Sequence, residues 1–160
     1  MSYTYSIGQI PTGGSFSINT GTVSTPVWVP IEEIQSFTLS GVEVKTVNAT
    51  NLQSTVAEVL PTLVDPGTAK VSCIRVPNAD ATGQAAVWTQ FILGAAQAPV
   101  EFKMQLPKNV AAGQTSTGDS FIASAYVIEC SPISDMSPEK IVMFEFSTKM
   151  VSLWTLTAGS

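Results

Sequence analysis

A strand, one helix and a second strand follow one another between residues 66 and 107, and this unit limits the possible folds more than any other feature. Residues 69–76 are rich in strand-favouring side chains. Residues 100–106 alternate apolar and polar side chains, as a half-buried strand does. Between them the pattern predicts a helix from about Thr82 to Leu93, and no other part of the chain has a helical pattern. The expected fold class is mainly β with a single flanking α-helix.

The predicted helix carries an apolar stripe that has two interpretations. Its members recur at helical spacing and are Val87, Trp88, Phe91 and Ile92. We expect the stripe to be the core face of a helix that packs on a sheet, because most amphipathic helices bury such a face. The alternative is a surface that binds a partner.

The chain carries few charges for its length. Of the 160 residues, 44% are apolar and only 12% are charged, about half the usual share of roughly 25%. A subunit buried among neighbours would have such a surface, and a tight β domain with many exposed Ser and Thr side chains is the alternative. The net charge is −5 and the basic residues are scattered, so we expect no tight binding to a nucleic-acid backbone, which requires clustered Lys and Arg.

The absence of histidine removes most catalytic and zinc-binding arrangements. The one adjacent pair of acids, Glu32 and Glu33, would point to opposite faces of a strand and would be a poor catalytic pair. No nucleotide-binding or calcium-binding motif occurs. We therefore expect no enzyme activity, no cofactor and no metal. Cys73 and Cys130 lie in predicted strands and are expected to be free thiols, with a bridge between them as the alternative.

Most of the remaining chain is predicted to form strands joined by loops. Residues 1–21 are polar and are interrupted by Pro11 and glycines, which is typical of a flexible N-terminal arm. Gly41 indicates a bulge or bend between two strands, and residues 107–118 indicate a mobile loop. Strands are expected at residues 23–29, 34–40, 42–47, 120–130, 140–148 and 151–156, the last two as a tight hairpin.

Residues 48–68 form a long connection that carries several apolar side chains without a clean period. A connection of this length is usually functional. An apolar one should be covered, for which another subunit is the first candidate. A poorly patterned core strand at residues 56–60 is the alternative.

No targeting or membrane segment is recognisable in the sequence. Residues 1–6 lack the positive charge and apolar core of a signal peptide. No stretch approaches the roughly 18 apolar residues that suggest a membrane helix. We expect synthesis in a cytoplasm and no membrane partner.

Three stretches of the chain resemble the tail tube proteins of long-tailed bacteriophages, in particular the tube domain of lambda-like major tail proteins. Residues 42–55 resemble the second long strand and the following loop of that family, with Gln53 where an acid is common. Residues 69–106 resemble its strand, helix and strand unit, and residues 139–157 resemble its closing hairpin. The same fold is shared with the tube protein of the type VI secretion system.

The resemblance implies a β-sandwich or barrel-like tail tube fold, with one domain over residues 1–160. Subunits would join their sheet edges into hexameric rings, and the rings would stack into the tail tube of the virion. The tube would surround a tape measure protein and would end at tail terminator and distal tail or baseplate proteins. Phage DNA would pass through an acidic lumen without tight binding.

The resemblance also implies roles for particular residues. The N-terminal arm at residues 1–21 and the loop at residues 48–68 would make contacts between subunits and between rings. The implied interface residues are Thr46, Asn48, Thr50, Leu52, Val59, Leu60 and Leu63. The implied lumen-facing residues are Glu43, Lys45, Glu101 and Lys103.

Two other classes of function fit the same composition. Another assembly subunit, such as a type VI-like tube, a head decoration or a fibre protein, would also have few surface charges. A β-sandwich that binds carbohydrate or another small ligand would present exposed aromatic rings, here Trp28 or Trp154.

Overall fold

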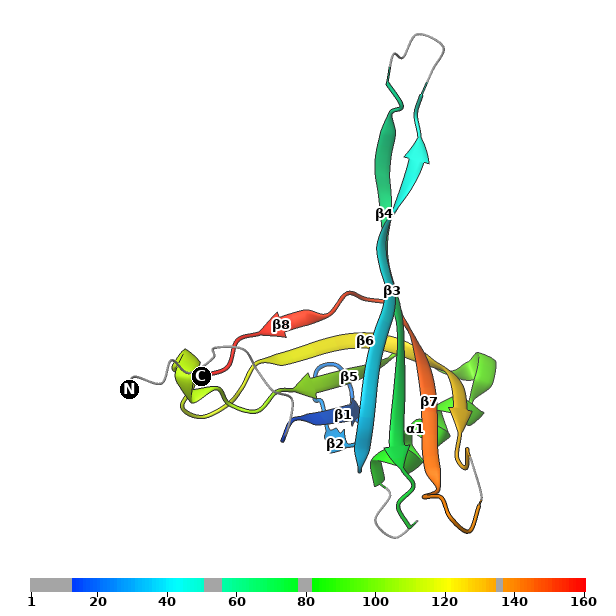
Figure 1. The fold of residues 1–160 in the computed structure, drawn as a ribbon, viewed down its shortest axis with the longest axis vertical. Coiled ribbons are helices and arrows are strands. Elements are labelled where there is room, and N and C mark those ends of the chain that lie inside the picture. Colours follow the sequence, from blue (N-terminus) through cyan, green and yellow to red (C-terminus); the bar gives the residue numbers. More distant parts are fainter. Residues whose placement is uncertain (1–12, 51–55, 78–81, 135–136) are drawn as a thin grey trace.

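The computed structural model describes residues 13–50, 56–77, 82–134 and 137–160. It contains eight antiparallel strands in one sheet of order β2-β1-β5-β6-β7-β4-β3, with β8 paired to β6 (Figure 1). The strands are β1 (Ser15–Asn19), β2 (Trp28–Pro30), β3 (Ile34–Asn48), β4 (Val59–Ile74), β5 (Val100–Gln105), β6 (Ser120–Ser131), β7 (Met143–Met150) and β8 (Thr155–Thr157). The helices are α1 (Thr82–Ile92) and the short 3-10 helices η1 (Gly94–Ala96) and η2 (Val110–Ala112). The predicted fold class and its strand, helix and strand unit are confirmed.

The sheet curls over itself because β6 pairs along its first half with β5 and along its second half with β7. Strands β3, β4 and β7 therefore lie across β1 and β5 (Figure 1). Aromatic side chains join the two halves of the sheet. Phe37 of β3 lies 5.3 Å from Phe16 of β1, and Phe146 of β7 lies 6.3 Å from Phe102 of β5, measured between ring centroids. The result is a barrel-like sandwich whose core consists of the inward-facing side chains of both halves.

The helix packs against the core through fewer residues than its stripe predicted. Val87 is fully buried and Phe91 is partly buried against the core. Trp88 and Ile92 are exposed, Ile92 by 60%. The prediction of a core face is therefore right for Val87 and wrong for Trp88 and Ile92. The reason is that α1 covers only one end of the sandwich, so that a single row of its side chains reaches the sheet.

Gly83 sets how closely the helix approaches the strand before it. A Cβ atom at this position would lie 2.1 Å from the carbonyl oxygen of Pro30 and 2.6 Å from the Cα atom of Ile31. Both atoms belong to the backbone, so they cannot move aside as a flexible side chain would. Only glycine fits here, and any larger residue would push the helix off the sheet.

The buried side chain of Gln84 connects α1 to the end of β4. Its oxygen accepts hydrogen bonds from the guanidinium of Arg75 at 3.0 Å and from the amide of Val76 at 3.3 Å. Its nitrogen donates to the carbonyl of Ile74 at 2.8 Å. Every polar atom of this fully buried side chain thus has a partner, as burial requires.

The carboxylate of Glu32 binds the first turn of the helix. It accepts hydrogen bonds from the amides of Gly83 and Gln84 at 2.8 and 3.0 Å and from the hydroxyl of Thr82 at 2.9 Å. Burial raises the pKa of Glu32, but these hydrogen bonds outweigh it and hold the pKa below 4.5. A negative charge at a helix N-terminus is also favoured by the helix dipole.

We expect Glu32→Gln to lower the free energy of unfolding by about 1 kcal/mol at pH 7, because the charged acceptor at the helix N-terminus is lost. A carboxyl with a lowered pKa contributes stability above its unfolded pKa and loses it as pH falls through its folded pKa. The difference between wild type and variant should therefore shrink below about pH 4.5. Urea unfolding from pH 3 to 7 measures it, with Glu33→Gln as the matched control; a difference independent of pH would contradict this role.

The structure corrects four predictions about the strands. Ser15–Asn19 form β1 in the core, so the prediction of an N-terminal arm is wrong for these residues, while residues 1–12 lie outside the described residues. The strand predicted at residues 23–29 is reduced to β2. The two strands predicted around Gly41 are one strand, β3, in which Gly41 adopts a φ of 72°. The closing hairpin is wrong because β8 pairs with the start of β6, beyond the end of β7.

The loop predicted at residues 48–68 is also largely wrong. Residues 59–68 belong to β4, and β3 continues to Asn48. Pro61 and Pro66 suggested a break in the chain. They are tolerated because β4 has a single neighbour there, since β7 pairs with it only from Thr68 onward. A proline in such an edge segment leaves no ladder hydrogen bond unmade.

Candidate assembly surface

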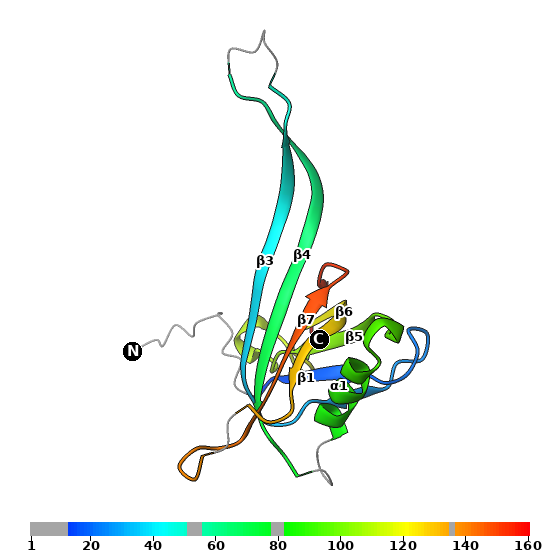
Figure 2. The same cartoon turned by 90° about the vertical axis from the view of Figure 1, so that its right-hand side faces the viewer.

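The most prominent feature of the molecule is a two-stranded ribbon that projects from the body (Figures 1 and 2). It consists of residues 42–48 of β3 and 59–66 of β4, and we call it the arm. The two strands pair from Val42 and Pro66 at its base to Asn48 and Val59 near its tip. The body contributes no strand to either side of the arm within the described residues. An isolated two-stranded ribbon is marginally stable in water.

The arm exposes an unusual number of aliphatic side chains for a solvated ribbon. Leu63 is 78% exposed, and the others are between 46% and 58% exposed: Val42, Val44, Val47, Val59, Leu60 and Val64. Contiguous apolar surface of this kind generally marks a site of protein association.

Specific contacts hold the arm to the body and keep its strands in register. At the base, the ammonium of Lys149 lies 2.7 Å from the carboxylate of Asp65, and its hydrogen bond lowers the pKa of Asp65. Gly67 has a φ of 86°, and a Cβ atom there would lie 2.4 Å from the carbonyl oxygen of Ser40. Higher up, the hydroxyl of Thr62 donates to the carbonyl of Lys45 at 2.9 Å across a bulge. The arm is thus an ordered extension of the sheet.

The predicted interface residues are largely brought together by the arm. Thr46, Asn48, Val59, Leu60 and Leu63 lie on it and Thr50 lies just beyond it, whereas Leu52 lies outside the described residues. Sequence reasoning missed Val42, Val44 and Val64, which are exposed on the same ribbon. The alternation at residues 42–47 predicted the strand of Val42 and Val44 correctly, whereas Val64 was assigned to the long connection. Alternation alone does not show whether the apolar face of a strand packs on the core or lies on the surface.

The four predicted lumen residues are not brought together. Glu43 and Lys45 form an ion pair on the arm. Glu101 and Lys103 lie on β5 in the other half of the sheet. There the carboxylate of Glu101 accepts a hydrogen bond from the side-chain amide of Asn19 at 2.9 Å, and the ammonium of Lys103 lies 4.9 Å from the ring centroid of Trp28. The two pairs therefore occupy separate surfaces.

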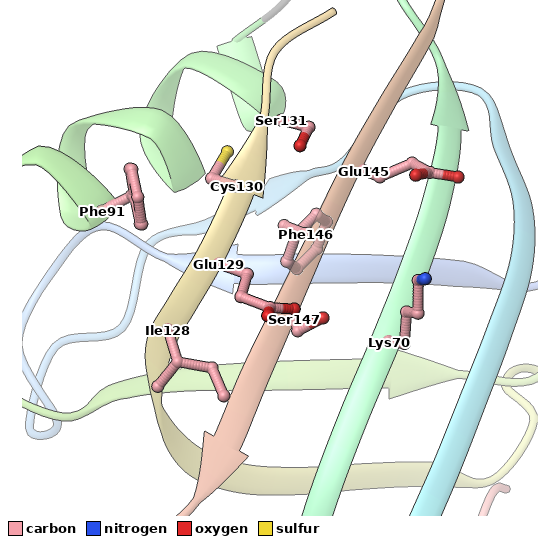
Figure 3. Close-up of a pocket in the computed structure, with 9 residues that line it drawn as sticks. All are labelled: Lys70, Phe91, Ile128, Glu129, Cys130, Ser131, Glu145, Phe146 and Ser147. Atoms are coloured by element: carbon pink, nitrogen blue, oxygen red, sulfur yellow. The ribbon is translucent and has the colours of Figure 1, made fainter. Parts of the chain in front are cut away.

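The half of the sheet formed by β3, β4, β7 and the end of β6 has one polar face. Its side chains alternate between the core and this face, so that Val71 and Phe146 are buried in the core while Lys70 is exposed on the polar face. The polar face includes Ser36, Thr38, Lys70, Ser72, Glu129, Glu145 and Ser147. Figure 3 shows Lys70, Glu129, Glu145 and Ser147 on it. Acidic and basic groups are interspersed, so the face carries no strong charge of one sign.

Cys73 and Cys130 are free, and burial raises the pKa of Cys73 to about 12 and that of Cys130 to about 11, so that both are neutral thiols at physiological pH. Among the described residues, no three metal-binding side chains come together. The helices of the described part are too short or too polar to cross a bilayer.

Comparison with known proteins identifies the fold. No family model and no curated protein matches the sequence. Among solved structures, the chain is similar to the SPP1 tail tube, with a TM-score of 0.68 and 14% identity over 94% of this chain and 80% of that one. It is similar to a chain in the virion of a native gene transfer agent, with a TM-score of 0.65 and 13% identity over 94% of this chain and 100% of that one. It is also similar to a chain in the tube-terminating cap of the anti-feeding prophage, with a TM-score of 0.64 and 13% identity over 99% of this chain and 95% of that one.

These matches cover nearly the whole chain, including the part that forms the arm. At identities this low, the likeness concerns the arrangement of the elements and not particular side chains. The chain therefore has the tail tube fold.

Proposed function

We propose that this protein is a structural subunit of a tail tube, in which identical copies form hexameric rings that stack into a hollow cylinder of a virion or a related particle. The observation that carries this proposal is the exposed apolar arm on a fold shared with the SPP1 tail tube and with chains of other tailed particles. A monomer that worked alone would gain nothing from exposing these side chains. A subunit that stacks would bury them against the next ring.

The polar face of β3, β4, β7 and β6 is the surface that we assign to the lumen. The opposite face of these strands carries the core, the β1 and β5 half of the sheet and the helix. That side is the bulkier one, so it fits the outer circumference of a ring and leaves the thin polar face inside. Of the predicted lumen residues, Glu43 and Lys45 belong to the arm and alternate to the opposite face of β3 from Ser36 and Thr38, and Glu101 and Lys103 would lie toward the outside.

The lumen would let DNA pass without holding it. The chain has a net charge of −5, and the polar face mixes Lys70 with Glu129 and Glu145, so it offers no basic cluster that would bind a polyanion tightly. Such a tube would be threaded by a tape measure protein during assembly and closed by terminator and baseplate proteins. Chains in the cap and in the baseplate of the anti-feeding prophage share the fold, which supports partners of this kind.

A tube of a contractile system is the second candidate within the same class. A chain in an extracellular contractile sheath and tube complex is similar to this one, with a TM-score of 0.62 and 12% identity over 91% of this chain and 88% of that one. The alternative of a small-ligand binding module is disfavoured, because neither tryptophan ring is free. The ammonium of Lys103 lies over the ring of Trp28, and the rings of Trp154 and Phe37 pack with centroids 6.1 Å apart.

Native mass spectrometry of the purified protein at increasing concentration tests the ring. We expect a closed species of six times the chain mass, alone or in multiples, to appear as the concentration rises. A monomer or dimer as the final species, with added tail-tip proteins as well as without them, would contradict the proposal.

A further inference from the structure

The C-terminal segment runs along the part of β6 that β7 leaves unpaired. The amide of Val151 donates to the carbonyl of Ser124 at 2.8 Å, and the hydroxyl of Ser152 accepts a hydrogen bond from the amide of Ser124 at 2.9 Å. Strand β8 then pairs with residues 120–122 of β6. Figure 1 shows β8 beside the first half of β6 and the C-terminus next to η2. The segment therefore ends at the connection between β5 and β6, which we call the β5–β6 loop (residues 106–119).

Three successive amides of the β5–β6 loop converge on one oxygen of Ser160. The distances from this oxygen to the amide nitrogens of Thr115, Ser116 and Thr117 are 2.9, 2.6 and 3.0 Å. A neutral carbonyl oxygen has two lone pairs, so a third amide exceeds what it ordinarily accepts. A run of amides that point to one position is typical of an anion-binding nest, and hydrogen bonds to a charged oxygen are the stronger ones. The arrangement is that of a site for a carboxylate oxygen.

Side chains of the same loop hold the backbone next to this oxygen. The amide of Gly159 donates to the carboxylate of Asp119 at 2.8 Å, and the same carboxylate oxygen accepts a hydrogen bond from the side-chain amide of Gln114 at 2.7 Å. The amide of Ser160 donates to the hydroxyl of Thr117 at 3.3 Å. Acceptors thus face the last amides of the chain, while donors face the oxygen of Ser160.

The shape of the loop also selects the residue at position 159. A Cβ atom on Gly159 would lie 2.3 Å from the carbonyl oxygen of Thr117 and 2.6 Å from the carbonyl carbon of Gly118. These atoms belong to the backbone, and the carbonyl of Gly118 is itself held by the side-chain amide of Gln105 at 2.6 Å. The loop therefore approaches the chain end too closely for any side chain at this position.

We propose that the β5–β6 loop is a binding site for the terminal carboxylate of Ser160, and that this contact locks the C-terminal segment onto β6. Capture of a terminal carboxylate by backbone amides is a recurring mode of recognition. The lock keeps a sheet edge covered, because β8 is the neighbour of residues 120–122 on the side of β6 away from β5. An open edge there would be available for pairing with another chain. The lock acts within the folded subunit and does not depend on the tube function.

Amidation of the terminal carboxylate tests the proposal with the amino-acid sequence unchanged. The full-length chain ending in a carboxamide keeps the shape of the chain end and removes its charge. We expect the amides of residues 115–117 to exchange with deuterium about tenfold faster in the amidated chain, because the charged acceptor is lost. Residues 123–127, in the middle of β6, should exchange as in the wild type. Mass spectrometry of the dilute protein measures both regions, and equal exchange at residues 115–117 in the two chains would overturn the carboxylate site.

Gly159→Ala provides an independent test through shape. We expect the added methyl group to release the chain end, so that residues 115–117 and 120–122 exchange at least tenfold faster than in the wild type. The matched control, Ala158→Ser, changes the exposed residue one position earlier and should exchange like the wild type. Wild-type exchange in Gly159→Ala would show that the loop does not bind the chain end. If this variant unfolds, the amidated chain decides the question, because its sequence is that of the wild type.

Discussion

Replacing residues 44–64 by an Asn-Gly turn is expected to abolish stacking while the body stays folded. The design joins Glu43 to Asp65, which already face each other across the ladder, and Asn-Gly is the favoured two-residue hairpin turn. The body should tolerate the change because the core residues lie outside the arm. Circular dichroism and thermal melting check the fold, and sedimentation of the polymer checks stacking.

The expected loss is large because each arm carries several half-exposed aliphatic side chains. Burying the remaining half of one such side chain contributes about 1 kcal/mol. Several together amount to about 5 kcal/mol, which corresponds to more than a thousandfold in the association constant. Pelletable polymer should therefore disappear at concentrations where the wild type forms it.

A milder change keeps this prediction testable if the shortened chain misfolds. Leu60→Ser with Leu63→Ser removes two exposed apolar side chains without shortening the ribbon, and Val110→Ser, at 72% exposure in η2, is the matched control. Tubes of normal length from the double variant, or from the chain without its arm, would show that the arm does not mediate stacking.

Phe102→Ala is expected to lower the free energy of unfolding by about 3–5 kcal/mol. Phe102 is fully buried and its ring lies 5.5 Å from that of Phe16 and 6.3 Å from that of Phe146. It therefore joins the two halves of the curled sheet, and the cavity left by alanine would lie between them. The total free energy of unfolding of a single domain is roughly 5–15 kcal/mol, so this variant should be close to unfolding.

Urea unfolding of the monomer measures this cost, with Val110→Ala as an exposed control. A loss below about 1 kcal/mol for Phe102→Ala would mean that the two halves are not joined through this ring.

The elements with a clear period were predictable from the sequence, and those shaped by distant pairing were not. The alternation at residues 100–106 and the helical spacing around Val87 gave β5 and α1 directly. β1 was missed because its Ser15, Ser17 and Asn19 made the segment read as a polar arm, although Phe16 and Ile18 alternate with them. Local composition outweighed a short but correct pattern.

The sequence-based predictions of the arm and of the closing strand were wrong for different physical reasons. Pro61 and Pro66 normally end strands, and nothing local to them shows that β4 has no second neighbour there. β8 pairs with β6 instead of β7, a choice that depends on where the chain turns after Met150 and not on the residues of β8. The structure exposes Val59, Leu60 and Leu63 on the arm, as expected of apolar side chains that follow no core pattern in the sequence, and their role at an interface stays a prediction. The lumen residues were not brought together, because the face that a polar strand residue occupies depends on the register of the whole sheet.

Negative-stain electron microscopy of the purified full-length protein, dilute and then concentrated, tests the tube function most directly. We expect hollow tubes or six-fold rings whose number rises with concentration, with a central channel along each tube. Thin fibres or closed trimers without a channel, or monomers at every concentration even after tail-tip proteins are added as initiators, would contradict the proposal that this chain builds a tube.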